Sequence, residues 1–141
     1  MSFLLDTNIV SEPMKPQPTP SVVRWLADAD EDHIFISVVT LAELRTGVER
    51  LAAGVKRKRL EEWLQDELPV RFEGRILAID PIVADACGKI VARCQDLGRP
   101  IEAMDAFIAA TAEVHRLTLV TRDVSDFKPA LKSVLNPWTI E

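Results

Sequence analysis

Five short apolar segments, separated by longer amphipathic stretches, constrain the fold of this chain more than any other feature. They are residues 3–5, 33–36, 76–79, 117–120 and 133–135. Apolar residues follow one another in them largely without polar alternation, which is typical of strands buried on both faces of a sheet. Because each segment ends in polar residues or proline, we expect four short strands and a still shorter fifth.

The stretches between these segments have a helical spacing of apolar residues. Helices are expected near residues 20–29, 38–53, 56–68, 83–97 and 103–116. Thr19-Pro20 is typical of a helix start, whereas Gly98 and Pro100 are typical of a helix stop. The segment 103–116 is apolar almost all round, so its helix is expected to be buried. Strands that alternate with helices predict an α/β fold, with a parallel sheet and helices on both of its faces.

Composition favours one globular domain and excludes several classes of protein. The 141 residues are 48% apolar and 28% charged, which is an ordinary globular balance. No apolar run is long enough to span a membrane, and the N-terminus lacks a signal-peptide pattern, so a cytoplasmic protein without a membrane partner is expected. Cys87 and Cys94 are expected to be buried free thiols, since residues seven apart on one helix are too distant for a disulfide.

The net charge of −5 argues against a protein that binds nucleic acid through bulk basicity. Residues 56–59 form a basic run, which could contact RNA phosphates or could be a solvated helix face balanced by nearby acidic residues. Trp25, Trp63 and Trp138 could stack on bases, but core or dimer packing is the expectation for them.

Four acidic residues stand out because of where they fall relative to the expected strands and helices. Asp6 directly follows the first strand, and Asp123 comes soon after the fourth. Asp105 lies in the first turn of the buried helix, and Glu43 lies on the flank of the helix after the second strand. In open α/β sheets, functional sites gather beyond the carboxyl ends of the strands, so these side chains are candidates for one site.

Each of these residues also has a structural alternative. Asp105 could cap its helix through backbone amides, Asp6 could cap the segment that follows it, and Asp123 could form an Asx-turn. Glu43 could point toward the end of the sheet or toward water, and the sequence alone does not decide between the two directions.

If the four carboxylates converge, they require cations. Two unit charges about 5 Å apart repel by roughly 3 kcal/mol at an effective dielectric constant near 20. Ligand sets made only of oxygen favour Mg²⁺ or Mn²⁺. The matching reaction is the attack of a metal-activated water on a phosphodiester. Neither His33 nor His115 is well placed as a general base, which agrees with such a mechanism.

Five blocks of sequence resemble a PIN domain of the VapC and FitB toxin type. They are residues 4–12 (LLDTNIVSE), 37–47 (SVVTLAELRTG), 74–80 (GRILAID), 105–112 (DAFIAATA), and 119–127 (LVTRDVSDF) with 136–138 (NPW). They cover essentially the whole chain in the family's order. The resemblance implies that residues 1–141 form a single PIN domain, a three-layer α/β/α sandwich around a mostly parallel sheet of about four or five strands.

The resemblance also implies an activity, a Mg²⁺- or Mn²⁺-dependent endoribonuclease that is the toxin of a type II toxin–antitoxin pair. The family's four acidic positions, which hold the metal, are matched by Asp6, Glu43, Asp105 and Asp123. Asp126 is an auxiliary fifth candidate. Polar positions that would orient the carboxylates or bound water are matched by Thr7, Asn8, Ser37 and Thr121.

Several partners follow from the same resemblance. They are an RNA substrate, a second copy of the chain in a homodimer, a small DNA-binding antitoxin that fills the acidic groove, and operator DNA bound only through that antitoxin. Two alternatives remain open. One is a non-catalytic PIN-fold module that binds RNA or protein, and the other is a phosphoryl-transfer enzyme or receiver domain with Asp6 as nucleophile. A haloacid-type phosphatase would have a second Asp where Asn8 stands.

Overall fold

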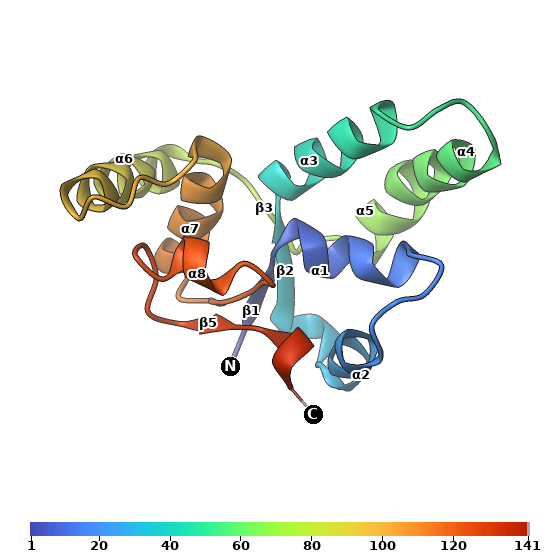
Figure 1. The fold of residues 1–141 in the computed structure, drawn as a ribbon, viewed down its shortest axis with the longest axis horizontal. Helices are drawn as coiled ribbons and strands as arrows, with labels where there is room; N and C mark the ends of the chain where they lie inside the picture. The colour runs from blue at the N-terminus through green and yellow to red at the C-terminus, as the bar shows by residue number, and fades with distance from the viewer. Residues whose placement is uncertain (141) are drawn as a thin grey trace.

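The computed structural model describes residues 1–140 and has a five-stranded sheet at its centre (Figure 1). Glu141, the last residue of the expected domain, lies outside the described residues. The strands are β1 (Phe3–Leu5), β2 (Ile34–Ser37), β3 (Ile76–Leu77), β4 (Thr118–Val120) and β5 (Val134–Leu135). All of them pair in parallel, in the order β3-β2-β1-β4-β5, which confirms the predicted α/β fold and its parallel sheet.

The strand order creates a topological switch point at the centre of the sheet. From β1 the chain moves outward to β2 and β3, and it then returns to the other side of β1 for β4 and β5. Leu5 pairs with Val120, and the Asp6 backbone N–H donates to the Val120 carbonyl at 2.9 Å. The residues that follow β1 and β4 therefore lie side by side at the carboxyl edge, where open α/β sheets hold their sites.

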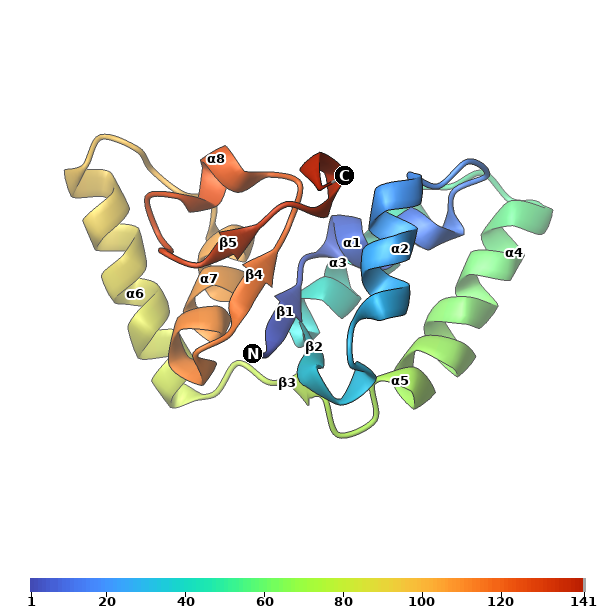
Figure 2. The same ribbon diagram turned by 90° about the horizontal axis from the view of Figure 1, so that it is seen from below.

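Helices lie on both faces of the sheet, so the molecule has the three expected layers (Figure 1, Figure 2). The helices on one side are α6 (Pro81–Asp96) and α7 (Ala103–His115), with the short α8 (Val124–Phe127) beside them. The helices on the other side are α1 (Thr7–Ser11), α2 (Pro20–Asp28), α3 (Val38–Glu49), α4 (Val55–Glu62) and α5 (Leu68–Arg71). Short helical turns are η1 (Glu12–Met14), η2 (Glu31–His33), η3 (Trp63–Glu67) and η4 (Pro137–Thr139).

The two layers of helices pack on opposite faces of the same short strands. Leu4 of β1 and Leu119 of β4 belong to the core beside α6 and α7. Leu5 and Val120, the next residue of each strand, belong to the core on the other face. All four side chains are at most 1% exposed. Because both faces are covered, neither strand can alternate apolar with polar residues, which explains the continuous apolar segments of the sequence.

Two expectations from composition can be compared with these elements. Cys87 and Cys94 lie on α6 and are buried free thiols, as the sequence predicts. Within residues 1–140, no helix combines the length and the apolar character that are needed to cross a bilayer.

The helix expected over residues 56–68 is longer and less regular than predicted. It begins at Val55 in α4, passes through a π-helical turn in η3, and ends at Arg71 in α5. In η3 the Leu68 N–H donates to the Trp63 carbonyl, five residues earlier. Pro69 explains the wider turn, because its ring would clash with the carbonyl four residues before it in a regular α-helix. The wider turn lets the helix continue past the proline.

The end of α6 is a glycine-capped turn, as predicted. Gly98 has a φ of 69°, in the left-handed region that favours glycine. Its N–H donates to the Gln95 carbonyl at 3.0 Å, and the Arg99 N–H donates to the Cys94 carbonyl at 2.9 Å. Together these bonds form a Schellman motif, and Pro100 follows it without an N–H that could extend the helix.

A buried carboxylate holds the loop between α1 and α2. Glu12, at the start of η1, is 2% exposed. Its Oε2 accepts the N–H and the hydroxyl of Thr19, both at 2.9 Å, and its Oε1 pairs with the Lys15 ammonium at 2.8 Å. Burial by itself would raise the pKa of Glu12, but these hydrogen bonds and the Lys15 charge lower it below its ordinary value.

The substitution Glu12→Gln should destabilise the protein by about 1–3 kcal/mol at neutral pH, because the charge-assisted bonds to Thr19 and Lys15 are weakened. A carboxylate with a lowered folded-state pKa stabilises the fold above its unfolded value, near 4.5, and loses that contribution as the pH falls through the folded value. In urea denaturation, the difference between wild type and variant should therefore shrink at acidic pH. Glu62→Gln, at an exposed position of α4, is the control, and equal losses in the two variants would contradict this role.

Candidate active site

Asp6 stands at the carboxyl end of β1 and is almost completely buried, with 5% of its surface exposed. Its Oδ1 accepts the Thr7 backbone N–H at 2.8 Å, and its Oδ2 accepts the Thr121 hydroxyl at 2.7 Å. Asp6 therefore caps α1, as one of the alternatives predicts, and it is also tied to the end of β4. The register of β1 against β4 produces the second contact, because it places Asp6 beside Thr121.

Glu43 lies on α3 and points toward the end of the sheet rather than toward water. Its Oε1 accepts the Thr7 hydroxyl at 2.6 Å, and its side chain is half-buried. The same hydroxyl lies 3.4 Å from the hydroxyl of Thr40, which is fully buried. The sequence prediction missed Thr40. A polar residue three positions before Glu43, on the same face of the helix, is the signal that could have identified it.

Asp123 follows β4 and is joined to α1 through Asn8. The Asn8 Nδ2 donates to Asp123 Oδ2 at 3.2 Å and lies 3.5 Å from the Thr121 hydroxyl oxygen. That hydroxyl oxygen also accepts the Asp123 N–H at 3.0 Å. Within residues 1–140, the Asp123 carboxylate caps no backbone N–H, so the Asx-turn alternative is wrong. Asn8 and Thr121 thus hold Asp123 and Asp6 at the same edge of the sheet.

Asp105 lies in the first turn of α7 but does not cap it. Glu102 occupies the N-cap position, and in the described part of the chain no backbone N–H donates to the Asp105 carboxylate. The capping alternative is therefore wrong. Asp105 is half-buried and lines a cavity together with Asp126 of α8. A partly buried carboxylate without such donors requires another source of neutralisation.

The negative charges around Asp105 act on it directly. Burial raises the pKa of Asp105 to about 6, and nearby negative charges contribute to the increase. These charges belong to Asp6, Glu43, Glu102 and Asp126. The side chains of α3, α7 and the end of β1 are therefore close enough for their charges to interact.

The pKa of Asp6 is shifted in the same direction. Burial raises its pKa above the ordinary value, while hydrogen bonds from Thr121 and Thr7 lower it, and the charges of Glu43 and Asp123 raise it. The net direction is upward, so the ionised form of Asp6 is disfavoured in the folded protein.

The chemistry of this donor set fits a divalent cation. The groups are carboxylate oxygens, which Mg²⁺ and Mn²⁺ prefer as ligands. As the side chains stand, no three His, Cys, Asp or Glu residues within residues 1–140 are grouped so that they could hold a metal ion. The pKa values of Asp6 and Asp105 are nevertheless raised, first by burial and then by nearby negative charges, and a bound cation would favour the ionised form of both carboxylates. For three or more of these carboxylates to bind one ion, their side chains would have to turn toward one another.

Three of the predicted residues, Ser37, Asp105 and Asp126, lie outside this hydrogen-bond network. Ser37 ends β2 and caps α3, with its hydroxyl oxygen accepting the Val39 N–H at 3.0 Å. Asp126 is exposed on α8 and acts on Asp105 through its charge. The residues that the structure links through hydrogen bonds at the carboxyl edge are Asp6, Thr7, Asn8, Glu43, Thr121 and Asp123.

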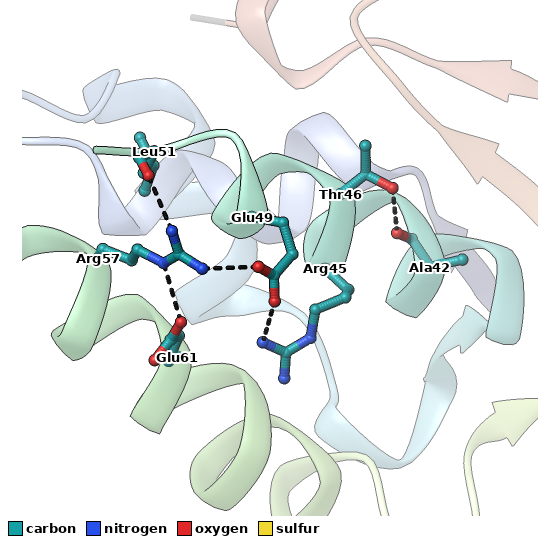
Figure 3. A network of polar contacts seen from close by, with 7 residues as sticks. All are labelled: Ala42, Arg45, Thr46, Glu49, Leu51, Arg57 and Glu61. Carbon is teal, nitrogen blue, oxygen red and sulfur yellow. Dashed lines mark hydrogen bonds and ion pairs between the residues drawn. The ribbon is translucent and has the colours of Figure 1, made fainter. Parts of the chain in front are cut away.

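The basic run on α4 includes Arg57, an arginine that joins α4 to the end of α3. In Figure 3, the guanidinium of Arg57 donates to Glu49 at 2.6 Å, to Glu61 at 3.0 Å and to the Leu51 carbonyl at 3.2 Å. Glu49 also pairs with Arg45 at 3.6 Å. Arg57 therefore joins the end of α3 to α4, which favours the balanced helix face over an RNA-binding patch at this residue.

The tryptophans pack against the core, as expected. Trp25, Trp63 and Trp138 are partly buried against the cluster that includes Leu5. Trp25 meets Phe3 edge to face, with ring centroids 5.1 Å apart.

Comparison with known proteins places this architecture in a family. The model of the PIN domain matches residues 3–128. The chain belongs to the PIN domain family. This PIN domain is 44% identical over 136 residues to Toxin FitB of Neisseria gonorrhoeae, covering 96% of this chain and 98% of the relative. It is 33% identical over 136 residues to a VapC ribonuclease of Sinorhizobium fredii, covering 96% of this chain and 97% of the relative.

Solved structures agree with this assignment. The PIN domain matches a chain of FitAB bound to a DNA fragment with a TM-score of 0.93 at 41% identity, covering 99% of this chain and 97% of that one. It also matches a chain of DNA-bound VapBC from Salmonella typhimurium with a TM-score of 0.80 at 26% identity, covering 97% of this chain and 98% of that one. The predicted resemblance to a PIN domain of the VapC and FitB type is confirmed.

The substitution Thr121→Val should raise the pKa of Asp6 further, because the hydroxyl that donates to the ionised carboxylate is lost. It should also destabilise the protein by about 1–3 kcal/mol, since Asp6 is buried. Carboxyl ¹³C NMR titration measures the first effect and urea denaturation the second. Thr46→Val is the matched control, because it removes an exposed hydroxyl that donates to the Ala42 carbonyl. If the two variants changed the pKa of Asp6 equally, the proposed contact would be wrong.

The substitution Asp105→Asn should raise the melting temperature of the metal-free protein at pH 7 by a few degrees. The folded-state pKa of about 6 lies above the ordinary 3.8, so the ionised side chain destabilises the folded protein. This destabilisation reaches its full size only above about pH 6. As the pH falls from 6 toward 3.8, the folded wild type gains a proton and the advantage of the variant should disappear. Asp85→Asn, at an exposed position paired with Lys89, is the control. A lower melting temperature for Asp105→Asn at pH 7 would contradict the account.

Proposed function

We propose that this PIN domain is a Mg²⁺- or Mn²⁺-dependent endoribonuclease and the toxin of a toxin–antitoxin pair. The observation that carries the proposal is the set of acidic side chains at the carboxyl edge of the sheet, where burial and like charges raise the pKa of Asp6 and Asp105. The relatives support it, because they are named Toxin FitB and VapC ribonuclease.

The metal would be held by Asp6, Glu43, Asp105 and Asp123. When bound, the ion supplies charge neutralisation and the activation of water for attack on a phosphodiester. The polar neighbours set the geometry. Thr121 fixes Oδ2 of Asp6, Thr7 fixes Oε1 of Glu43, and Asn8 holds Oδ2 of Asp123. These neighbours carry no charge, so they orient the carboxylates without replacing the cation.

An acidic protein with this site can accept RNA. The four proposed ligands account for most of the net charge of −5. Once divalent ions neutralise them, this edge of the sheet no longer repels phosphate. Mg²⁺ sites commonly combine one or two carboxylates with phosphate oxygens of the substrate, which suits RNA.

The same edge can accept an inhibitory partner. Solved relatives include FitAB and VapBC complexes, some of them bound to DNA. A small antitoxin that places an arginine or lysine against Asp6 and Glu43 would neutralise these residues without a metal ion. Operator DNA would then be bound through the antitoxin. The homodimer, and a single PIN domain over residues 1–141, remain predictions.

The purified protein should cleave structured RNA in Mg²⁺ or Mn²⁺, and EDTA should stop the reaction. Asp6→Asn and Asp105→Asn should each lower the rate by about a hundredfold or more, because each removes a proposed metal ligand. Asp85→Asn, on the exposed face of α6, removes one carboxylate elsewhere and should cleave at the wild-type rate. Gel analysis of end-labelled RNA measures the rates.

Cleavage that survives both EDTA and Asp6→Asn would contradict the proposal. RNA binding without any cleavage by the wild type, in either metal, would support the non-catalytic binding module instead.

A further inference from the structure

Arg99 is a cation near the acidic site that has no role in the function described so far. Its backbone is fixed on both sides, because it completes the Schellman motif of α6 and precedes Pro100. Its Nη2 donates to the Ser125 carbonyl of α8 at 3.1 Å. The loop between α6 and α7 runs beside α8 in Figure 2. An exposed arginine is therefore held in a defined position.

Arg99 shares a cavity with three acidic residues. The cavity has a volume of about 370 Å³, and its charged lining consists of Arg99 and of the acidic residues Glu102, Asp105 and Asp126. Pro100 and Pro129 contribute apolar wall. This volume lies in the range of small-molecule sites and can hold one nucleotide unit.

The guanidinium of Arg99 retains unused donors. It has five N–H groups, and within residues 1–140 its side chain makes one hydrogen bond, to the Ser125 carbonyl. In that part of the chain Arg99 forms no ion pair with Glu102, Asp105 or Asp126, although all four residues line the same cavity. The remaining N–H groups can therefore bind an anion from outside the protein.

We propose that Arg99 binds a phosphate of the RNA substrate in this cavity, next to Asp105. A guanidinium binds phosphate through two parallel hydrogen bonds, and the fixed position of Arg99 reduces the entropy lost on binding. The carboxylates alone would repel the backbone of the substrate, and Arg99 offsets that repulsion on the α8 side of the site. The inference rests on the proposed nuclease function and names a residue by which that site holds its substrate.

A phosphate contact has a recognisable effect on kinetics. It carries no information about the base, so its loss should affect RNAs of different sequence by the same factor. It is made in the ground state and in the transition state alike, so its loss should raise KM rather than lower kcat. It also contributes to the salt dependence of binding.

The test compares Arg99→Gln with Arg24→Gln, which removes an exposed arginine on α2, in the Mg²⁺-dependent cleavage of two unrelated single-stranded RNAs. Arg99→Gln should raise KM about tenfold for both RNAs, with kcat nearly unchanged. The slope of log(1/KM) against log salt concentration should fall in magnitude by about 0.7, the value for one phosphate contact on a single strand. Arg24→Gln should behave as the wild type in both respects.

The alternative is that Arg99 only ties the loop to Ser125. Arg99→Gln would then lower the melting temperature while KM and the salt slope stay at wild-type values, and that result would overturn the proposal. If Arg99→Gln does not fold, KM is measured for Arg99→Met, because methionine keeps an unbranched apolar stem but removes the charge and every N–H donor of the side chain. A raised KM at an unchanged melting temperature supports the proposal, and a wild-type KM overturns it. A wild type that cleaves no RNA would overturn the proposed function itself, and this inference with it.

Discussion

The burial of neighbouring carboxylates at one edge of a parallel sheet is the constraint on which the rest of this structure depends. The strand order places the ends of β1 and β4 side by side, so that Asp6 meets the residues around Asp123. The helices α3 and α7 then bring Glu43 and Asp105 within range of Asp6. This arrangement raises the pKa values of Asp6 and Asp105, so the ionised forms of both side chains destabilise the folded protein. Raised pKa values of this kind concentrate at functional sites, and a bound divalent cation would stabilise the ionised carboxylates.

The fold stabilises these carboxylates with neutral groups and uses its cations elsewhere. Thr7, Asn8 and Thr121 donate hydroxyl or amide hydrogens to the edge of the sheet. By contrast, within residues 1–140 no lysine or arginine forms an ion pair with Asp6, Glu43, Asp105 or Asp123. The cations pair elsewhere, as Arg57 does in joining α4 to α3 and Lys15 does in neutralising the buried Glu12. A site oriented by neutral donors keeps its negative charge, and that charge is what recruits a metal ion or the basic residue of a partner.

The parts of the fold that depend on local sequence could be predicted, and those that depend on distant contacts could not. Burial on both faces imposes continuous apolar segments, so the strands and the parallel sheet were predictable, and Asp6 could be assigned to the site because it ends a strand. The direction of Glu43 depends on a hydrogen bond from Thr7, which is 36 residues away in sequence. The position of Arg99 in the cavity likewise depends on Ser125, 26 residues later. No periodicity in the sequence reports such contacts.

The pKa of the Asp105 side chain, followed by carboxyl ¹³C NMR with and without Mg²⁺, tests the central claim most directly. The account predicts a pKa of about 6 in the metal-free protein, because burial and the neighbouring carboxylates disfavour the ionised form. At saturating Mg²⁺ it predicts a fall to the ordinary value of 3.8 or below, since the bound cation reverses the local charge. A pKa near 3.8 without metal, or a pKa that Mg²⁺ leaves unchanged, would contradict the claim that this edge of the sheet is built for a divalent cation.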